Sequence, residues 1–207
     1  STDRTLDMLA EVPQVEVLYR SFDSFAKQCT FGLSQIATRW CLSLDADHLI
    51  TDSFTQEMEF LISHNAIDIA AYLTPFRYCV YGKPLRGTLL PPRFNLIRSH
   101  GGRYEDDGHS HRFIPSGPVV VMKASIWHDD RKPLSRWLLS QQRYLSLEVD
   151  KLLVASPSQL SFPDRIRRRK LFSPVFVFLL CLIWKRGFLD GWRGWFYAFQ
   201  RTYVELL

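Results

Sequence analysis

An Asp-x-Asp sequence at residues 45–47 follows directly on an apolar run. The run, residues 40–44, is Trp-Cys-Leu-Ser-Leu, and the carboxylates belong to Asp45 and Asp47. A buried strand that ends in this way delivers both carboxylates to the rim of a sheet, where oxygen ligands suit a hard divalent cation such as Mg²⁺ or Mn²⁺. A cation held there would bind the phosphates of a substrate. The alternative is that the acidic residues only form the turn that ends a strand.

Two further segments are dense in ionisable side chains. Residues 99–112 are Ser-His-Gly-Gly-Arg-Tyr-Glu-Asp-Asp-Gly-His-Ser-His-Arg, a composition that indicates a functional loop, with a solvated turn as the alternative. Residues 126–133 are Ile-Trp-His-Asp-Asp-Arg-Lys-Pro. Asp129 and Asp130 in this segment are suited to cap a helix that begins near Pro133.

The first part of the chain alternates between predicted helices and strands. Helices are expected over about residues 2–10, from Asp23 or Ser24 to about residue 37, and from Thr51 or Asp52 to about residue 63. Strands are expected at residues 15–19 and 40–44. Strand, helix and strand with short joints favour a parallel α/β unit, and ligands gather at the carboxyl ends of such strands.

The pattern changes after residue 66. Strands are expected at residues 67–72, 76–81, 93–97 and 119–122, and a surface excursion at residues 82–92. A long amphipathic helix is expected at residues 134–154, and Pro157 and Pro163 mark a break after it. These patterns predict an α/β domain over residues 1–156, with a mixed sheet flanked by helices, and a helical, aromatic-rich extension over residues 157–207.

The composition limits the classes of function. The 207 residues are 46% hydrophobic with a net charge of +5, which favours phosphate-bearing or anionic-membrane partners over uncharged ones. The only dense basic run adjoins an apolar segment, which argues against a nucleic-acid binder. The cysteines are scattered and form no Cys-x-x-Cys pair, so neither a zinc site nor a disulfide framework is expected. They are expected to be reduced core residues of a cytoplasmic protein.

Three blocks of the sequence, taken in order, resemble a known enzyme family. The chain opens with Ser-Thr-Asp-Arg-Thr, residues 22–28 are Phe-Asp-Ser-Phe-Ala-Lys-Gln ahead of the strand that ends in Asp45-Ala46-Asp47, and residues 185–194 are Lys-Arg-Gly-Phe-Leu-Asp-Gly-Trp-Arg-Gly. In this order they resemble the family 2 inverting glycosyltransferases of the nucleotide-sugar-binding (GT-A) fold, in particular the lipopolysaccharide core glucosyltransferase-like subgroup. The resemblance spans nearly the whole chain.

The resemblance implies a GT-A-like, Rossmann-like fold and the transfer of a sugar from a nucleotide-sugar donor to a cell-envelope or lipid-linked glycan acceptor. It implies a Mg²⁺ or Mn²⁺ ion whose ligands come from Asp45, Asp47 and His128. In the family, commonly only one of the two Asp residues touches the metal, and the other acts through water or the ribose.

The resemblance also implies contacts to the nucleotide. The residues at the matching positions are Asp23, Lys27, Gln28 and Asp45. The first three would equally serve as a helix cap and exposed helix residues, without any function. Arg131 and Lys132 are candidates for binding the diphosphate, since the planar guanidinium of Arg matches phosphate oxygens.

An inverting transfer needs a carboxylate that removes the proton of the acceptor hydroxyl. The subgroup often carries a His-Glu pair in the loop before a Gly-Pro strand entry, and here residues 107–111, Asp-Gly-His-Ser-His, stand before Gly117-Pro118. Because the Glu is missing, we predict Asp107 as the base, with His109 or His111 as substitutes. The remaining candidates are Glu105, Asp106, Asp129 and Asp130.

One departure from the family concerns the start of the chain. The family's first strand and the carboxylate after its second strand, which bind the base and ribose, precede the Ser-Thr-Asp turn with which this sequence opens. We therefore expect a fragment without the first βαβ unit. The alternative function is a truncated, non-catalytic, membrane-associated binding module.

The carboxyl-terminal part indicates a membrane surface. The apolar run at residues 171–184 is interrupted by Ser173-Pro174 and is shorter than the about 20 residues of a spanning helix. Basic residues at 165–170 and 185–186 flank it, and Trp and Tyr residues follow, which suits an anionic headgroup region. The expected location is cytoplasmic, peripheral to the inner face of the cell membrane. Alternatively, the aromatic residues pack on the catalytic domain as a helical hairpin.

Overall fold

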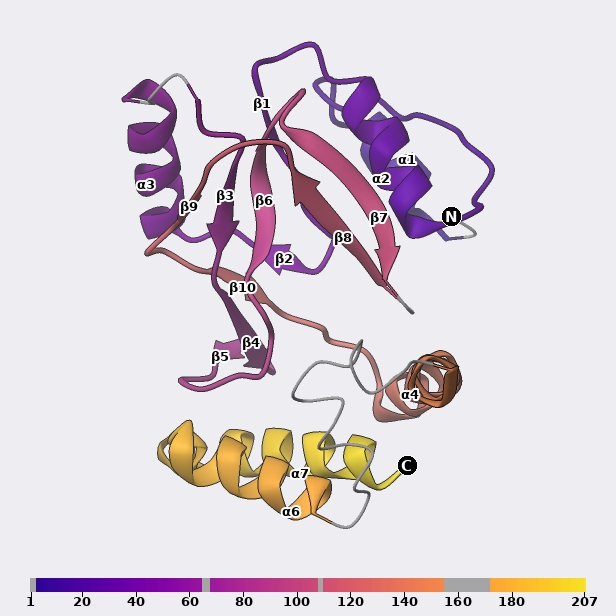
Figure 1. Ribbon diagram of the computed structural model, residues 1–207, viewed down its shortest axis with the longest axis vertical. Coiled ribbons are helices and arrows are strands. Elements are labelled where there is room, and N and C mark those ends of the chain that lie inside the picture. Colours follow the sequence, from indigo (N-terminus) through magenta and orange to yellow (C-terminus); the bar gives the residue numbers. More distant parts are fainter. Residues whose placement is uncertain (1–2, 65–67, 108–109, 155–171) are drawn as a thin grey trace.

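The computed structural model describes residues 3–64, 68–107, 110–154 and 172–207 (Figure 1). Its helices are α1 (Thr5–Ala10), α2 (Phe25–Ser34), α3 (Asp52–Ser63), α4 (Leu134–Val154), α6 (Ser173–Leu179) and α7 (Trp192–Leu206), with a π-helical turn η1 (Leu180–Trp184) and a 3₁₀ turn η2 (Gly187–Asp190). Its strands are β1 (Trp40–Leu42), β2 (His48–Leu49), β3 (Ala71–Thr74), β4 (Phe76–Val80), β5 (Lys83–Pro84), β6 (Arg93–Arg98), β7 (Gly102–Asp107), β8 (Ser110–Pro115), β9 (Val119–Val121) and β10 (Ile126–His128).

Two mixed sheets are joined by two segments of the chain, each of which passes from a strand of one sheet into a strand of the other. One has the order β1-β6-β3-β9 and the other β2-β10-β4-β5. Pro75 separates β3 from β4, and β9 and β10 run parallel to these two strands. The joint is closed by the Met122 N–H, which donates to Leu73 O at 2.9 Å, and by the Ile126 N–H, which donates to Pro75 O at 3.1 Å. The chain therefore continues from one sheet into the other without losing its backbone pairing.

The predicted mixed α/β architecture is confirmed. Helix α4 has the predicted bounds, and α3 begins after Thr51, whose hydroxyl accepts the Phe54 N–H at 3.2 Å. Helix α2 is capped by Ser24, whose side chain accepts the Lys27 N–H at 3.3 Å. It ends at Ser34, three residues earlier than expected, because helix ends are the part of a helix that sequence patterns predict least well.

The predicted parallel unit between residues 15 and 44 is wrong. Residues 15–19 form no strand, and Tyr19 is 78% exposed. Strand β1 instead pairs antiparallel with β6, in the register Cys41↔Ile97. Past the end of β1, the Ser43 N–H donates to Asn95 O at 2.8 Å and the Asn95 side chain donates to Ser43 O at 2.6 Å. Alternation of apolar and polar residues predicts which side chains share a face of a strand, but it does not show that another strand is available to pair with.

The expected polar loop at residues 99–112 is largely a β-hairpin. Strands β7 and β8 pair antiparallel, with Tyr104 opposite Phe113 and their rings 5.2 Å apart. Phe113 is buried against Ala71 and Ile97. The hairpin was missed because its apolar residues alternate with charged ones, so that the segment looks polar as a whole.

Two larger cores hold the structure together. The first lies between α3 and the sheets and is made of Phe54, Tyr72, Phe76, Leu96, Met122 and Ile126. The second joins β4 and β5 to the C-terminal helices and is made of Val80, Leu85, Val177, Cys181, Leu182, Tyr197 and Ala198.

All four cysteines are free. Cys79 and Cys181 are buried, and burial raises the pKa of each thiol to about 11.

The C-terminal segment forms a helical hairpin of α6, η1, η2 and α7, seen at the bottom of Figure 1 below β4 and β5. In the part of the chain that the structure describes, no helix is both long and apolar enough to cross a membrane. The predicted domain boundary at residue 156 and the basic run at residues 165–170 lie outside the described residues.

The first core provides a stability test on a single helix. Phe54 is fully buried, whereas Phe60 on the same helix is 59% exposed. Phe54→Ala is expected to lower the free energy of unfolding by about 3–5 kcal/mol, through lost burial and the cavity left behind. Phe60→Ala is the matched control and is expected to change it by less than about 1 kcal/mol. Urea unfolding measures both, and equal effects would contradict the packing described.

Candidate metal centre

A short antiparallel strand pair brings the candidate site together. Strands β2 and β10 pair with His48 directly opposite His128. The pairing continues past the strands, because the Asp129 N–H donates to Asp47 O at 3.0 Å. Residues 81 positions apart in the sequence therefore lie side by side (128 − 47 = 81).

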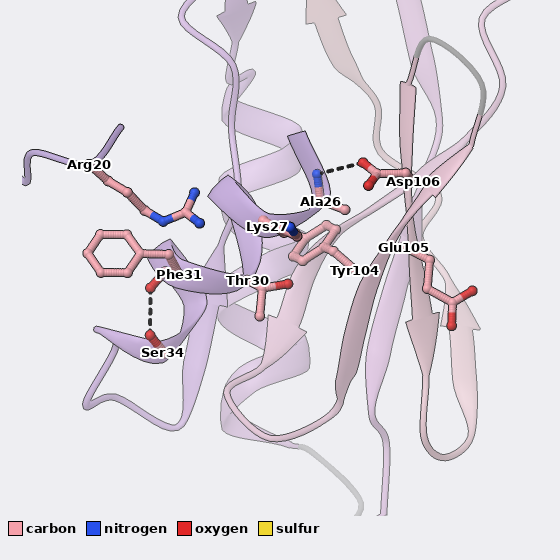
Figure 2. A pocket seen from close by; sticks show the side chains of 9 residues that line it. All are labelled: Arg20, Ala26, Lys27, Thr30, Phe31, Ser34, Tyr104, Glu105 and Asp106. Carbon is pink, nitrogen blue, oxygen red and sulfur yellow. Dashed lines mark hydrogen bonds between the residues drawn. The ribbon is translucent and has the colours of Figure 1, made fainter. Parts of the chain in front are cut away.

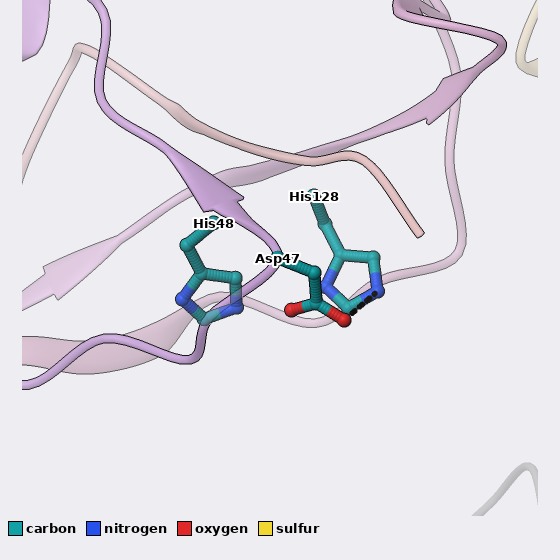
Figure 3. Close-up of side chains that lie close together, drawn as sticks. All are labelled: Asp47, His48 and His128. Atoms are coloured by element: carbon teal, nitrogen blue, oxygen red, sulfur yellow. Dashed lines mark ion pairs between the residues drawn. The ribbon is translucent and has the colours of Figure 1, made fainter. Parts of the chain in front are cut away.

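The turn between β1 and β2 orients the acidic residues. The His48 N–H donates to Asp45 O at 3.0 Å, and the Asp45 N–H donates to His48 Nδ1 at 3.0 Å. These two hydrogen bonds between Asp45 and His48 fix the backbone around Asp47. The carboxylate of Asp47 consequently lies between the two imidazole rings, as Figure 3 shows.

Asp47, His48 and His128 form a candidate metal centre. Each offers one ligand atom, and these atoms lie within 4.8 Å of one another; no other group of three or more His, Cys, Asp or Glu ligands meets this condition within the described residues. Asp47 Oδ2 is 3.7 Å from His128 Nε2. Asp47 Oδ1 is buried and has no hydrogen-bond partner among the residues that the structure describes. A buried carboxylate oxygen without a partner is unfavourable, and a bound cation would remove that penalty.

The donor set fits a divalent cation with open coordination positions. One carboxylate with one or two imidazoles leaves room for phosphate oxygens and water, which Mg²⁺ and Mn²⁺ commonly bind. Imidazole nitrogen favours a transition ion, so the set suits Mn²⁺ better than Mg²⁺. Asp47 and His128 are thus brought together as the sequence predicted.

The protonation state of His48 decides whether its ring can bind a metal ion. Its Nδ1 accepts the Asp45 N–H, so the neutral ring carries its proton on Nε2, which lies 3.5 Å from Asp45 Oδ2. Burial, together with the nearby His128, lowers the pKa of His48, so the ring is neutral at pH 7. In this arrangement His48 orients Asp45, and it would become a metal ligand only by releasing the Asp45 N–H.

Asp45 lies outside the three-residue cluster. Its side chain is 57% exposed, and Oδ2 is 3.5 Å from His48 Nε2 and 3.9 Å from an Arg93 guanidinium nitrogen. The charge of Asp45 also acts on His111 and Tyr104 from the β7–β8 hairpin. Burial and Arg93 lower the pKa of His111, and burial raises that of Tyr104 to about 12.

The predicted diphosphate-binding residues are held in local ion pairs. Arg131 Nε donates to Asp129 Oδ2 at 2.6 Å, and Lys132 Nζ lies 3.2 Å from Asp130 Oδ1. Asp129 is buried, and its Oδ1 also accepts the Gly82 N–H at 3.1 Å. Asp129 thus ties the end of β10 to the tight β4–β5 turn, in which Tyr81 and Gly82 both have positive φ. Its two bonds make it a poor candidate for a base.

The predicted nucleotide-contacting residues of α2 gather around Arg20. The guanidinium makes two bonds to Asp23, at 2.8 and 2.9 Å, and one to Gln28 Oε1 at 3.1 Å. The Arg20 bonds lower the pKa of Asp23 to about 2. Lys27 Nζ is 3.6 Å from Asp23 Oδ2.

A pocket of about 490 Å³ lies between α2 and strand β7 (Figure 2). Its polar side chains come from Arg20, Lys27, Thr30, Ser34, Tyr104, Glu105 and Asp106. Lys27 is thus the one residue of the predicted trio that lines it.

The predicted base Asp107 is the last residue of β7 and pairs with Ser110, and its side chain lies outside the described part of the structure, as does the whole of His109. The other candidates on this hairpin are engaged. Glu105 binds Arg103 at 2.7 Å, and Asp106 Oδ1 accepts the Ala26 N–H at the start of α2 at 3.2 Å. His111 stacks on Phe25, with ring centroids 5.9 Å apart.

Two residues of these sites were not predicted from the sequence. His48 directly follows Asp47. Its place at the start of a strand after the acidic turn could have indicated it as a further ligand. Arg20 lies in a segment that was expected to follow a strand, and no sequence pattern singled it out.

Comparison of the sequence with models of known protein families finds no family that matches, and comparison with curated proteins finds no match either. The site is therefore interpreted from its own geometry.

The geometry predicts which candidate ligands contribute most to the affinity for Mn²⁺. Asp47→Asn and His128→Gln are each expected to weaken Mn²⁺ binding by at least about tenfold, since each removes a donor from the cluster. Asp45→Asn is expected to have a smaller effect, because that carboxylate faces His48 and Arg93. Electron paramagnetic resonance of free Mn²⁺ measures the affinities, with exposed Asp68→Asn and His64→Gln as matched controls. A loss at Asp45 larger than at Asp47 would contradict this ranking.

Proposed function

We propose that the protein is a metal-dependent inverting glycosyltransferase that moves a sugar from a nucleotide-sugar to a cell-envelope or lipid-linked glycan acceptor. The observation that carries the proposal is the buried, unpartnered Asp47 Oδ1 beside His128 at the end of an acidic turn. The resemblance to the GT-A family, drawn from the sequence alone, gives that cluster its chemical meaning. The mixed α/β fold is compatible with it.

In this proposal Asp47 and His128 hold Mn²⁺ or Mg²⁺. When bound, the cation offsets the negative charge that develops on the departing diphosphate. Arg93, 3.9 Å from Asp45, adds a further positive charge at the same rim. Asp45 is half-exposed and free to accept hydrogen bonds from the ribose of the donor.

The remaining donor contacts come from two places. Arg131 and Lys132 lie on the segment that directly follows His128, and their exposed ends would exchange their carboxylate partners for phosphate oxygens. Lys27 and Arg20 line the pocket beside β7 and offer cationic groups to the nucleotide. Gln28 and Asp23 would act by holding Arg20 in place.

The acceptor hydroxyl requires a base, and we propose Asp107. It ends β7, on the hairpin that also carries Tyr104 and His111, on whose pKa values the charge of Asp45 acts. Asp129, by contrast, is buried and doubly bonded. A base must accept a proton, and the Asp129 carboxylate is already held by a guanidinium, which makes it less suited to that role.

The competing proposal is a non-catalytic, membrane-associated binding module. For either function we propose a cytoplasmic location at the inner face of the cell membrane, on the strength of the flanking basic and aromatic residues of the C-terminal segment.

The decisive binding test uses nucleoside diphosphates. Titration calorimetry with a panel of nucleoside diphosphates is expected to show binding with Mn²⁺ and none with a chelator. Asp47→Asn should remove the cation dependence, because it replaces the charged carboxylate by a neutral amide, whereas exposed Asp68→Asn should retain it. Equally tight binding with the chelator would refute the metal-dependent mechanism.

The base assignment is tested by turnover. With a lipid extract of the cell envelope as acceptor, Asp107→Asn is expected to lower diphosphate release by a factor of about 10² to 10⁴ and to leave donor binding unchanged. Asp129→Asn is expected to lower thermal stability, because it breaks the bonds to Gly82 and Arg131. An active Asp107→Asn protein together with a stable but inactive Asp129→Asn protein would move the base to the His128 segment.

A further inference from the structure

A second, basic pocket contains none of the residues of the metal cluster. It has a volume of about 640 Å³ and lies between the β4–β5 region and the turn that connects η1 with η2. Arg77 and Arg86 line it from one side, and Lys185 and Arg186 from the other. Asp190 is the one acidic residue among the described residues that line it.

The charges in this pocket do not balance. Asp190 is engaged by Arg86 alone, through the Arg86 N–H at 2.9 Å and the Arg86 Nε at 3.3 Å. Arg77, Lys185 and Arg186 are exposed and form no ion pair with any residue that the structure describes. A concave site with three cations left over attracts an anion with several oxygens.

The backbone holds the cations in place. Residues 180–184 form a π turn, in which the Lys185 N–H donates to Leu180 O at 2.8 Å. Arg186 follows with φ of +57°, a conformation that is unfavourable for a residue with a Cβ and that clusters at ligand sites. Gly87 packs directly against the Lys185 backbone, and a Cβ there would clash with Lys185 O. The arrangement is thus fixed before any ligand arrives.

Large exposed apolar side chains lie on the same C-terminal segment as Lys185 and Arg186. Trp184 lines the pocket and is 82% exposed, and Ile183 is 60% exposed. Phe188 and Leu189 on η2 are each 49% exposed. Further exposed apolar residues continue along the helical hairpin: Val175, Phe176, Leu179, Trp192, Trp195 and Phe199. Aromatic residues next to Lys and Arg are typical of surfaces that lie at the headgroup level of a bilayer.

We propose that this pocket binds the phosphate of an anionic lipid headgroup while Trp184 and its apolar neighbours enter the membrane interface. The three unpaired cations match the phosphate, and the apolar side chains match the acyl boundary beside it. A soluble phosphate would use the cations but would leave the apolar side chains in water. The proposal does not depend on glycosyl transfer, because none of the pocket residues belongs to the metal cluster.

Vesicle sedimentation tests the proposal with the whole chain. Binding is expected to phosphatidylcholine vesicles that contain phosphatidylglycerol, to weaken in high salt, and to be lost with phosphatidylcholine alone. Lys185→Gln with Arg186→Gln is expected to lower the affinity by about fivefold for each charge removed. The control pair Arg4→Gln with Lys123→Gln removes the same charge from exposed positions elsewhere and should have little effect.

A second pair of variants tests the contribution of the apolar side chains to vesicle binding. Trp184→Ala is expected to weaken binding, whereas Tyr19→Ala, at another exposed aromatic residue, should not. Unchanged melting temperatures would show that these exposed positions leave the fold intact. Equal losses in the control pair, no binding to either vesicle, or inorganic phosphate bound as tightly as the anionic vesicles would each overturn the proposal.

Discussion

The pairing of β2 with β10 is the contact on which the candidate site depends. It consists of only two residue pairs, Leu49 with Trp127 and His48 with His128, extended by the Asp129 N–H to Asp47 O. Such a short ladder is not stable alone. Without it, the Asp47 carboxylate would lose its approach to His128 and would keep only the His48 ring beside it.

The rest of the fold supports this pairing from both ends of β10. Before the strand, the Glu57 carboxylate on α3 accepts the backbone N–H groups of Lys123 and Ala124, at distances down to 2.6 Å. After it, Asp129 binds the β4–β5 turn. The ring of His128 stacks on Tyr78, which in turn lies 5.3 Å from Tyr197 of α7. The C-terminal hairpin therefore contributes to the position of a metal-site side chain as well as to the second core.

Local patterns in the sequence predicted much of this. The capping Thr51 and the bounds of α4 follow from caps and periodicity. The approach of Asp47 to His128 was implied by the resemblance to the glycosyltransferases. What could not be predicted depends on pairing between distant segments. Residues 15–19 alternate but have no partner edge, the β7–β8 hairpin hides Phe113 among charged residues, and His48 gains its role only through β10. The separation of Asp45 from the cluster likewise arises from the turn geometry around His48.

The central claim is that Asp47 and His128 together hold a divalent cation that binds a diphosphate. A crystal structure with Mn²⁺ and a nucleoside diphosphate, with data collected at the manganese absorption edge, tests this most directly. The account predicts one anomalous peak within coordination distance of Asp47 Oδ1 and His128 Nε2, with diphosphate oxygens completing the shell. A peak bound by Asp45 without Asp47, or a nucleotide bound away from this rim with no metal beside it, would contradict the account.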